Sequence, residues 1–509
     1  FENQPLQMNN FKTAWKNYSV SLKEFLHRDS AAIITQKQQA EEVLYNGICR
    51  TERLKVPGAI DLVDSKDNNH LQVHEDDILA YADMDRVLEE LELRGTMPVE
   101  YIKSAPLIMS FMQNYKVKHD IQEEMKAKPE KLPLLNSPRL WINKNKVAGY
   151  KPLNIHHARF EKLKETVLYG EAARLLWVLP SLPYYELGGP FRNQENFSKT
   201  LVFSAWEMVP RAVSTLISYE AERLTVGTLI KKIPGQQSER RSYFHDSKNK
   251  RFPPPRVTFS VKDNEPANMN YLCLLHPSVT LASMYDPIEA MNRDMSIKDI
   301  LREVQDKIKG HLDGFRHYVR REGQRQDERW YYMAPLLMGR SQPRIQEWFK
   351  NPVLQSVDED HDGVVGQEED SYALSLHLER LKNLYQDPEQ VELGLMPEDL
   401  ARVLTNMAIA SPAICALRML GPDTPRAVGL SWQLAKTIVD RFNTQEAIAM
   451  VDLSYGKAGE GVHWKNILRY CLDGNLQAVL DEYAHMLLDG HDMQHCSPEE
   501  LEKRNQALV

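Results

Sequence analysis

Cysteine is scarce in this chain, and the few cysteines present do not form a recognisable framework. The 509 residues contain five of them, none in a CxxC pair: Cys49, Cys273, Cys415, Cys471 and Cys496. A small secreted domain held together by disulfides needs closely spaced cysteines, so that class of protein is excluded. We expect a cytoplasmic location, because a reducing compartment is the default for such a sequence.

Long apolar runs and targeting signals are also missing. No apolar run approaches the roughly 18 residues that a membrane-spanning helix needs, so no membrane partner is expected. The first residues, FENQPLQMNNFKTAW, lack an initiator Met and the charged and apolar regions of a signal peptide. We expect the chain to be a piece of a longer polypeptide, cut at both ends.

The sequence has no phosphate-binding loop of the GxxxxGK[ST] kind and no Asp-Glu pair placed to hold magnesium beside one. The segment YGKAGEG (455–461) contains a Gly-Lys pair. However, Val451 stands where the loop needs its first glycine, and Ala458 stands where it needs a hydroxyl group. We therefore expect that these residues alone do not hydrolyse ATP.

A strong charge of one sign is absent as well. The chain has 63 basic and 71 acidic residues, a formal net charge of −8. This balance gives no overall attraction to nucleic acids, although a local basic track remains compatible with it.

Helical periodicity dominates what is present. Apolar residues three and four positions apart predict helices at 11–47, 74–95, 98–112, 116–128, 157–169, 209–225, 296–321, 343–357, 372–386, 398–418, 429–453 and 462–489. Apolar runs of strand length occur in the first half of 174–191, at 199–206 and at 256–261. The pattern predicts a mixed, mainly α fold with one α/β piece near residues 150–230.

The strongest strand signal is KTLVFSAWEMVPR (199–211). Lys199 precedes four apolar residues, then Ser204, Trp206 and a helix with Pro210 in its first turn. A continuous apolar run is typical of a parallel strand covered by helices on both faces. The carboxyl end of such a strand brings a hydroxyl and backbone N–H groups to a position where they can meet a phosphate.

This stretch resembles the fourth motif of superfamily 2 helicases, in which a Lys and an apolar strand lead to Phe-Ser and an aromatic residue. Two flanking segments agree in order with the Swi/Snf-like branch: HARFEKLKETVL upstream, and YNGICRTERLKV (45–56), which resembles the end of that branch's first motor domain. In the latter, Cys49 replaces an Arg and Glu52 replaces a Lys. The resemblance is specific over about residues 157–226, and relatives of this kind include bacterial proteins of phage-defence systems such as DISARM.

The resemblance implies a RecA-like α/β piece between helical segments. Residues 1–150 would be a helical region after the first motor domain, 151–230 the start of the second RecA-like domain, and 231–509 a mainly helical insertion. It implies part of an ATP-dependent DNA helicase or translocase in antiphage defence, with DNA and defence-complex proteins as partners. ATP and Mg would be bound mainly by parts outside this chain.

The residues expected at the nucleic acid are Lys199, Ser204 and Trp206, together with a basic loop just after the predicted motor helix. That loop supplies Arg240, Arg241, Lys248, Lys250, Arg251 and Arg256, interleaved with aromatic residues. Cations neutralise phosphates, and aromatic rings stack on unpaired bases. A second basic cluster spans 316–329. For each cluster alone, an ordinary solvated surface is the alternative interpretation.

The segment DEDHDGVVGQEE (358–369) matches a calcium-binding EF-hand loop. Its ligand positions hold Asp358, Asp360, Asp362, the carbonyl of Val364, and Glu369. Pro352 interrupts the entering helix, and no second EF-hand exists to pair with it. The alternatives are therefore a calcium or magnesium clip, or a solvated acidic loop. With the clip, the chain could instead be a non-catalytic, helical interaction module.

Histidines give only weak signals. His491 and His495 lie four positions apart beside Cys496, a spacing that suits zinc, but no fourth ligand is evident. The end of a surface helix is the favoured interpretation. His156 and His157 form a pair in a predicted loop, with no function assigned to them.

Overall fold

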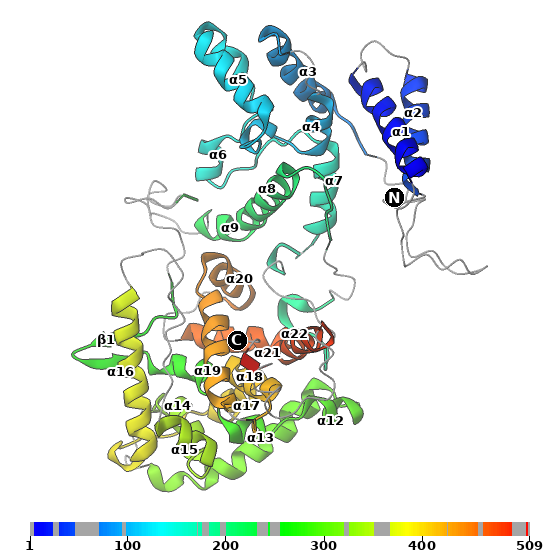
Figure 1. Ribbon diagram of the computed structural model, residues 1–509. Helices are drawn as coiled ribbons and strands as arrows, with labels where there is room; N and C mark the ends of the chain where they lie inside the picture. Colours follow the sequence, from blue (N-terminus) through cyan, green and yellow to red (C-terminus); the bar gives the residue numbers. More distant parts are fainter. Residues whose placement is uncertain are drawn as a thin grey trace. The chain divides into compact units, whose positions relative to one another are not determined.

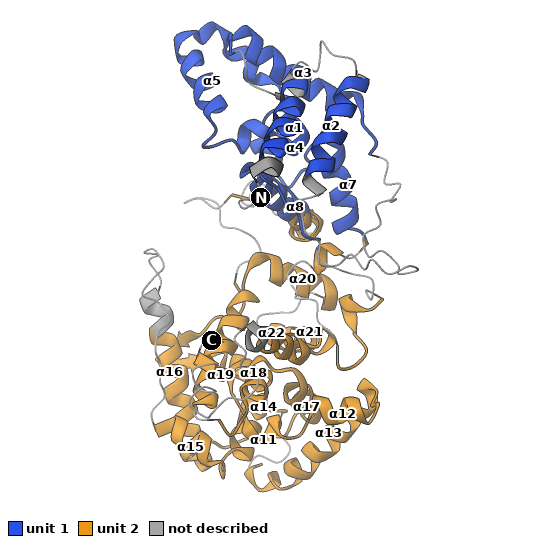
Figure 2. Ribbon diagram, turned by 45° about the vertical axis from the view of Figure 1, so that its right-hand side comes forward, with its two compact units in different colours: residues 1–169, 200–220 blue, residues 170–199, 221–509 orange. Residues whose placement is uncertain are grey.

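The computed structural model describes residues 5–23, 30–45, 71–93, 98–170, 172–175, 183–193, 200–231, 243–244, 255–319, 325–350, 367–424, 426–456, 462–490 and 505–506. The chain divides into two compact units (Figure 2). Unit 1 contains residues 1–169 and 200–220, and unit 2 contains residues 170–199 and 221–509. The sequence predicts three consecutive regions. In the structure, residues 170–199 belong to unit 2, although the residues before and after them belong to unit 1.

Unit 1 is built from helices, one of which, α8, ends across the unit boundary. They are α1 (Pro5–Lys23), α2 (Ser30–Tyr45), α3 (Glu75–Glu90), α4 (Pro98–Ser104), α5 (Lys116–Ala127), α6 (Lys144–Ala148), α7 (Ala158–Val167) and α8 (Met208–Leu224) (Figure 1). The core includes Met84 and Val87 of α3, Ile121 of α5 and Leu216 of α8, all at most 1% exposed. These positions follow the apolar spacing that predicts the helices.

Unit 2 is mainly helical, and its described residues include a small hairpin. Its elements are α9 (Val226–Lys231), β1 (Ser260–Lys262), β2 (Glu265–Ala267), α10 (Leu272–Leu275), α11 (Val279–Ala282), α12 (Pro287–Asn292), α13 (Ile297–Asp313), α14 (Trp330–Met338), α15 (Pro343–Lys350), α16 (Gln367–Gln386), α17 (Leu400–Ala410), α18 (Pro412–Leu420), α19 (Ala427–Arg441), α20 (Gln445–Tyr455), α21 (His463–Asp473) and α22 (Leu476–Gly490). The prediction of a mainly α fold is confirmed.

The hairpin β1–β2 is the only multi-residue sheet in the described ranges. Its strands are antiparallel, with Ser260 opposite Ala267. Asp263 and Asn264 form the turn with positive φ values of 53° and 62°, the conformation that Asp and Asn tolerate in tight hairpins. The sequence predicts a strand at 256–261, whereas the observed strand β1 begins only at Ser260.

The core of unit 2 is centred on α17 and α18. Met407, Ala408, Ile414 and Leu417 are fully buried, and α13, α19, α21 and α22 pack against this pair. Pro412 occupies the first turn of α18, where its missing N–H group costs no hydrogen bond. Among the described helices no single one is long and apolar enough to span a membrane, and only the bent pair α17–α18 meets that test by length and composition.

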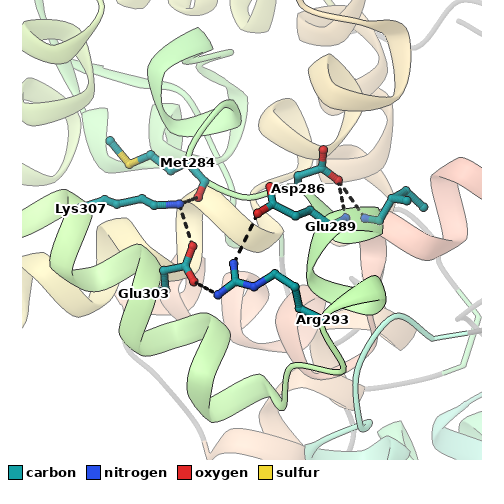
Figure 3. Close-up of polar contacts among 7 residues, drawn as sticks. Met284, Asp286, Glu289, Arg293, Glu303 and Lys307 are labelled. Carbon is teal, nitrogen blue, oxygen red and sulfur yellow. Dashed lines mark hydrogen bonds and ion pairs between the residues drawn. The ribbon is translucent and has the colours of Figure 1, made fainter.

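A surface network joins α12 to α13 (Figure 3). Arg293, at the C-terminal end of α12, contacts Glu289 of that helix at 3.4 Å and Glu303 on α13 at 2.9 Å. Lys307 then donates to Glu303 at 3.0 Å and to the carbonyl of Met284 at 3.1 Å. These contacts hold α12 and the segment before it against α13.

Candidate functional sites

The segment that resembles the helicase motif has an unusual environment. Residues 200–204 form neither helix nor strand, and Leu201, Val202 and Phe203 are 77%, 43% and 88% exposed. The buried strand predicted there is not formed, because no strand of the described part of unit 1 is available to pair with it. Lys199 lies outside the described residues.

Ser204 and Trp206 occupy different environments. The Ser204 Oγ atom accepts a hydrogen bond from the Trp206 N–H at 3.1 Å, which turns the chain toward α8, and Ser204 remains exposed. The Trp206 ring packs edge-on against Tyr101, with ring centroids 5.1 Å apart, and stacks near Tyr115 at 6.2 Å. Trp206 therefore anchors the start of α8 in the core of unit 1.

Arg256 requires a correction. It is 8% exposed, and its two terminal nitrogens each lie 2.5 Å from a carboxylate oxygen of Asp452 on α20. A guanidinium enclosed in this way cannot reach a DNA phosphate, so Arg256 does not belong to the predicted basic loop surface. The other five basic residues of that loop, 240, 241, 248, 250 and 251, lie outside the described residues.

In the second basic cluster, 316–329, two of the described arginines have partners within the protein. Arg316 pairs with Asp313 at 2.7 Å, and Arg329 donates to Asp327 at 2.7 Å and to the Glu392 carbonyl at 2.6 Å. The neighbouring Trp330 is fully buried. Its ring is therefore not available to stack on a base.

The predicted metal ligands are mostly beyond the described residues. Asp358, Asp360, Asp362 and Val364 lie there, and Glu369 falls in the first turn of α16. Helix α15 ends at Lys350, before the segment, and α16 begins at Gln367, within it. Within the described ranges, no group of three or more His, Cys, Asp or Glu residues could hold a metal ion. His491, His495 and Cys496 also lie outside the described residues.

Unit 1 contains a cleft of about 560 Å³ that sequence reasoning missed. One wall comes from residues 71–77, where α3 begins, and the other from residues 155–165, where α7 begins. Carboxylates and histidines dominate its lining. The sequence signals for it are the acidic first turn of α3 and the adjacent His156 and His157, but nothing in the sequence indicates that these two segments meet.

An ion-pair network holds the first wall of the cleft. Arg139 donates to Asp76 Oδ1 from two nitrogens, at 2.8 and 3.0 Å, and contacts Asp83 at 3.2 Å. The His156 Nδ1 atom lies 3.4 Å from the other oxygen of Asp76. Hydrogen bonding to Arg139 is the main reason that the pKa of the Asp76 carboxyl lies below its ordinary value.

His157 holds the second wall. It is 8% exposed, and its Nδ1 atom accepts a hydrogen bond from the Phe160 N–H at 3.0 Å, so that it caps α7. Burial lowers the pKa of the His157 ring below its ordinary value. The cap requires the neutral ring, because only an unprotonated nitrogen accepts a hydrogen bond.

Unit 2 contains a polar brace between three helices. The Tyr331 hydroxyl donates to Asp399 at 2.5 Å. The Lys465 ammonium donates to Tyr331 at 2.7 Å and to Asp399 at 3.0 Å. These residues tie α14, the start of α17 and α21 together. Their mutual hydrogen bonds satisfy one another, which suits a structural role.

Comparison with known proteins adds no relatives: no family model, curated protein or solved structure matches this chain.

Proposed function

We propose that this chain is part of an ATP-dependent DNA helicase or translocase of the Swi/Snf-like kind, acting in antiphage defence. In this proposal, ATP and Mg bind elsewhere in the protein, since these residues lack the phosphate loop. The chain contributes contacts to DNA, and its helical unit 2 offers surfaces for protein partners of a defence complex.

The observation that carries the proposal is the exposed apolar run Leu201-Val202-Phe203 directly before Ser204 and α8. Three consecutive large apolar side chains at 77%, 43% and 88% exposure cost free energy in water. A strand that completes a RecA-like sheet with neighbours from other parts of a longer protein would bury them. The sequence resemblance implies such a strand at this position.

The structure removes two of the expected residues from the proposed DNA surface. Ser204 is exposed and can meet a phosphate, whereas Trp206 and Arg256 are committed to packing and to a buried ion pair. The proposed cations are therefore Lys199, Arg240, Arg241, Lys248, Lys250 and Arg251.

The test is duplex DNA binding by fluorescence anisotropy over a series of salt concentrations. We expect the logarithm of the affinity to fall linearly with the logarithm of salt concentration, because cations release counterions from DNA. Replacing Arg240 or Arg241 by Ala should reduce the slope by about 1, because each variant neutralises one phosphate fewer. Lys126→Ala on α5, an exposed residue paired with Glu123, is the matched control and should leave the slope unchanged. Absent or salt-independent binding contradicts the proposal.

A second candidate function is a non-catalytic helical interaction module with a calcium-binding loop at 358–369. It is favoured by the largely helical packing, by α15 before the loop and by α16, which begins within it. Calcium that binds only the folded state should raise the Tm, and Asp358→Ala should abolish that gain. A wild-type Tm that calcium leaves unchanged eliminates the metal site.

A further inference from the structure

His157 lines the cleft in unit 1 at the start of α7, and Asp77 of the other wall acts on its ring electrostatically. Its ring is almost completely buried between the start of α7 and neighbouring elements, and its Nδ1 atom supplies the cap of α7. The residues next to it, 155–158, line the cleft together with residues 71–77. The first turn of α7, which forms part of this wall, is therefore capped by a hydrogen bond that a titratable ring accepts.

We propose that His157 is an acid-sensitive latch: its neutral ring caps α7 and holds the cleft wall in place, and its protonation releases that wall. A proton on Nδ1 converts the acceptor into a donor that faces the donor N–H of Phe160. It also places a positive charge at the N-terminus of α7, where the helix dipole is already positive. Both effects favour fraying of the first turn of α7.

The charged groups around the ring do not prevent this release. Arg159 on α7 opposes protonation, whereas Asp77 on α3 and the backbone of Ile102 and Lys103 on α4 favour it, and burial outweighs them. The neighbouring His156 lies beside Asp76, which Arg139 already pairs.

The sign of the pH dependence follows from burial. The folded state disfavours the charged ring, so the unfolded or frayed state binds the proton more readily. The stability of the cap is complete above the ordinary histidine pKa of about 6.5 and is lost as the pH falls from there toward the lowered pKa. The latch thus opens as the pH falls below the ordinary histidine pKa.

The test is amide hydrogen exchange of peptides covering 158–167, measured between about pH 7.5 and pH 5 and corrected for the intrinsic pH dependence of exchange. We expect protection in the wild type to fall by about fivefold or more on acidification, the effect of losing one cap. His157→Asn should keep protection nearly constant, because Asn caps helices well and does not titrate in this range.

The matched control is His119→Asn, which changes an exposed histidine on α5 and should retain the wild-type pH dependence. The latch is disproved by constant protection in the wild type, or by an equal loss in His157→Asn. Should His157→Asn fail to fold, an NMR titration of labelled histidines in the wild-type chain decides the matter. A His157 ring that titrates at or above about pH 6.5 contradicts the latch.

Discussion

Arg256 and Arg293 show how burial sets the value of an ion pair. Both arginines contact carboxylates, but the Arg256 and Asp452 side chains are 9% and 3% exposed, whereas those of Arg293 and Glu303 are 49% and 35% exposed. At the surface, water and dissolved ions solvate the charge that remains when one partner of a pair is removed, so little stability is lost. In the interior, removal of one partner leaves an uncompensated charge.

We therefore predict that Arg256→Ala destabilises unit 2 by about 3 to 5 kcal/mol, because Asp452 would remain buried without this cation. Arg293→Ala, the control, should cost less than about 1 kcal/mol. Urea unfolding followed by circular dichroism measures both. Equal effects of the two variants would refute the assignment of Arg256 to a buried structural pair.

At the scale of elements, periodicity predicts most helices correctly. In α13 the buried residues Ile300, Val304, Ile308 and Leu312 are spaced by four and form one stripe. The pattern cannot separate adjacent helices, so it predicts one helix over 398–418, although Pro412 divides this segment into α17 and α18. Boundaries of this kind depend on one residue and on the tertiary packing around it.

The strand expected at 199–206 is absent for a different physical reason. A strand needs a neighbour for its backbone groups, and an apolar run alone does not supply one. Likewise, Arg256 belongs to a basic stretch in the sequence, but its partner Asp452 is far along the chain. The cleft in unit 1 also depends on two distant segments, 71–77 and 155–165, and no local pattern connects them.

Helix α13 allows the contribution of an N-cap to stability to be tested. Ser296 caps it by accepting a hydrogen bond from the Asp299 N–H at 3.3 Å. We predict that Ser296→Ala lowers the free energy of unfolding by about 1 kcal/mol, and that Ser296→Asn retains most of it, since Asn caps equally well. Ser283→Ala, which removes an exposed hydroxyl at the C-terminal end of α11 and not at an N-cap, is the control. Urea unfolding measures these free energies. If Ser296→Asn loses as much unfolding free energy as Ser296→Ala, the serine stabilises the helix by packing and not by capping.

At the scale of the whole molecule, each unit has its own hydrophobic core. Ile108 belongs to the core of unit 1 and Leu417 to that of unit 2, and both are fully buried. Separate cores favour separate cooperative transitions, because disrupted packing in one core leaves the packing of the other intact. The boundary at 220/221 falls within α8, so the chain connection is continuous while the cores are distinct.

We predict that Ile108→Ala and Leu417→Ala, which each cost about 2 to 5 kcal/mol, act on different units. Hydrogen exchange resolved by peptide under mild urea should show faster opening of α3 and α5 in Ile108→Ala, and of α17, α18 and α19 in Leu417→Ala. The double variant should show the sum of both effects, because mutations in independent cores are additive. If either single variant accelerates exchange equally in both units, the two cores unfold as one, and the chain must be treated as a single cooperative body.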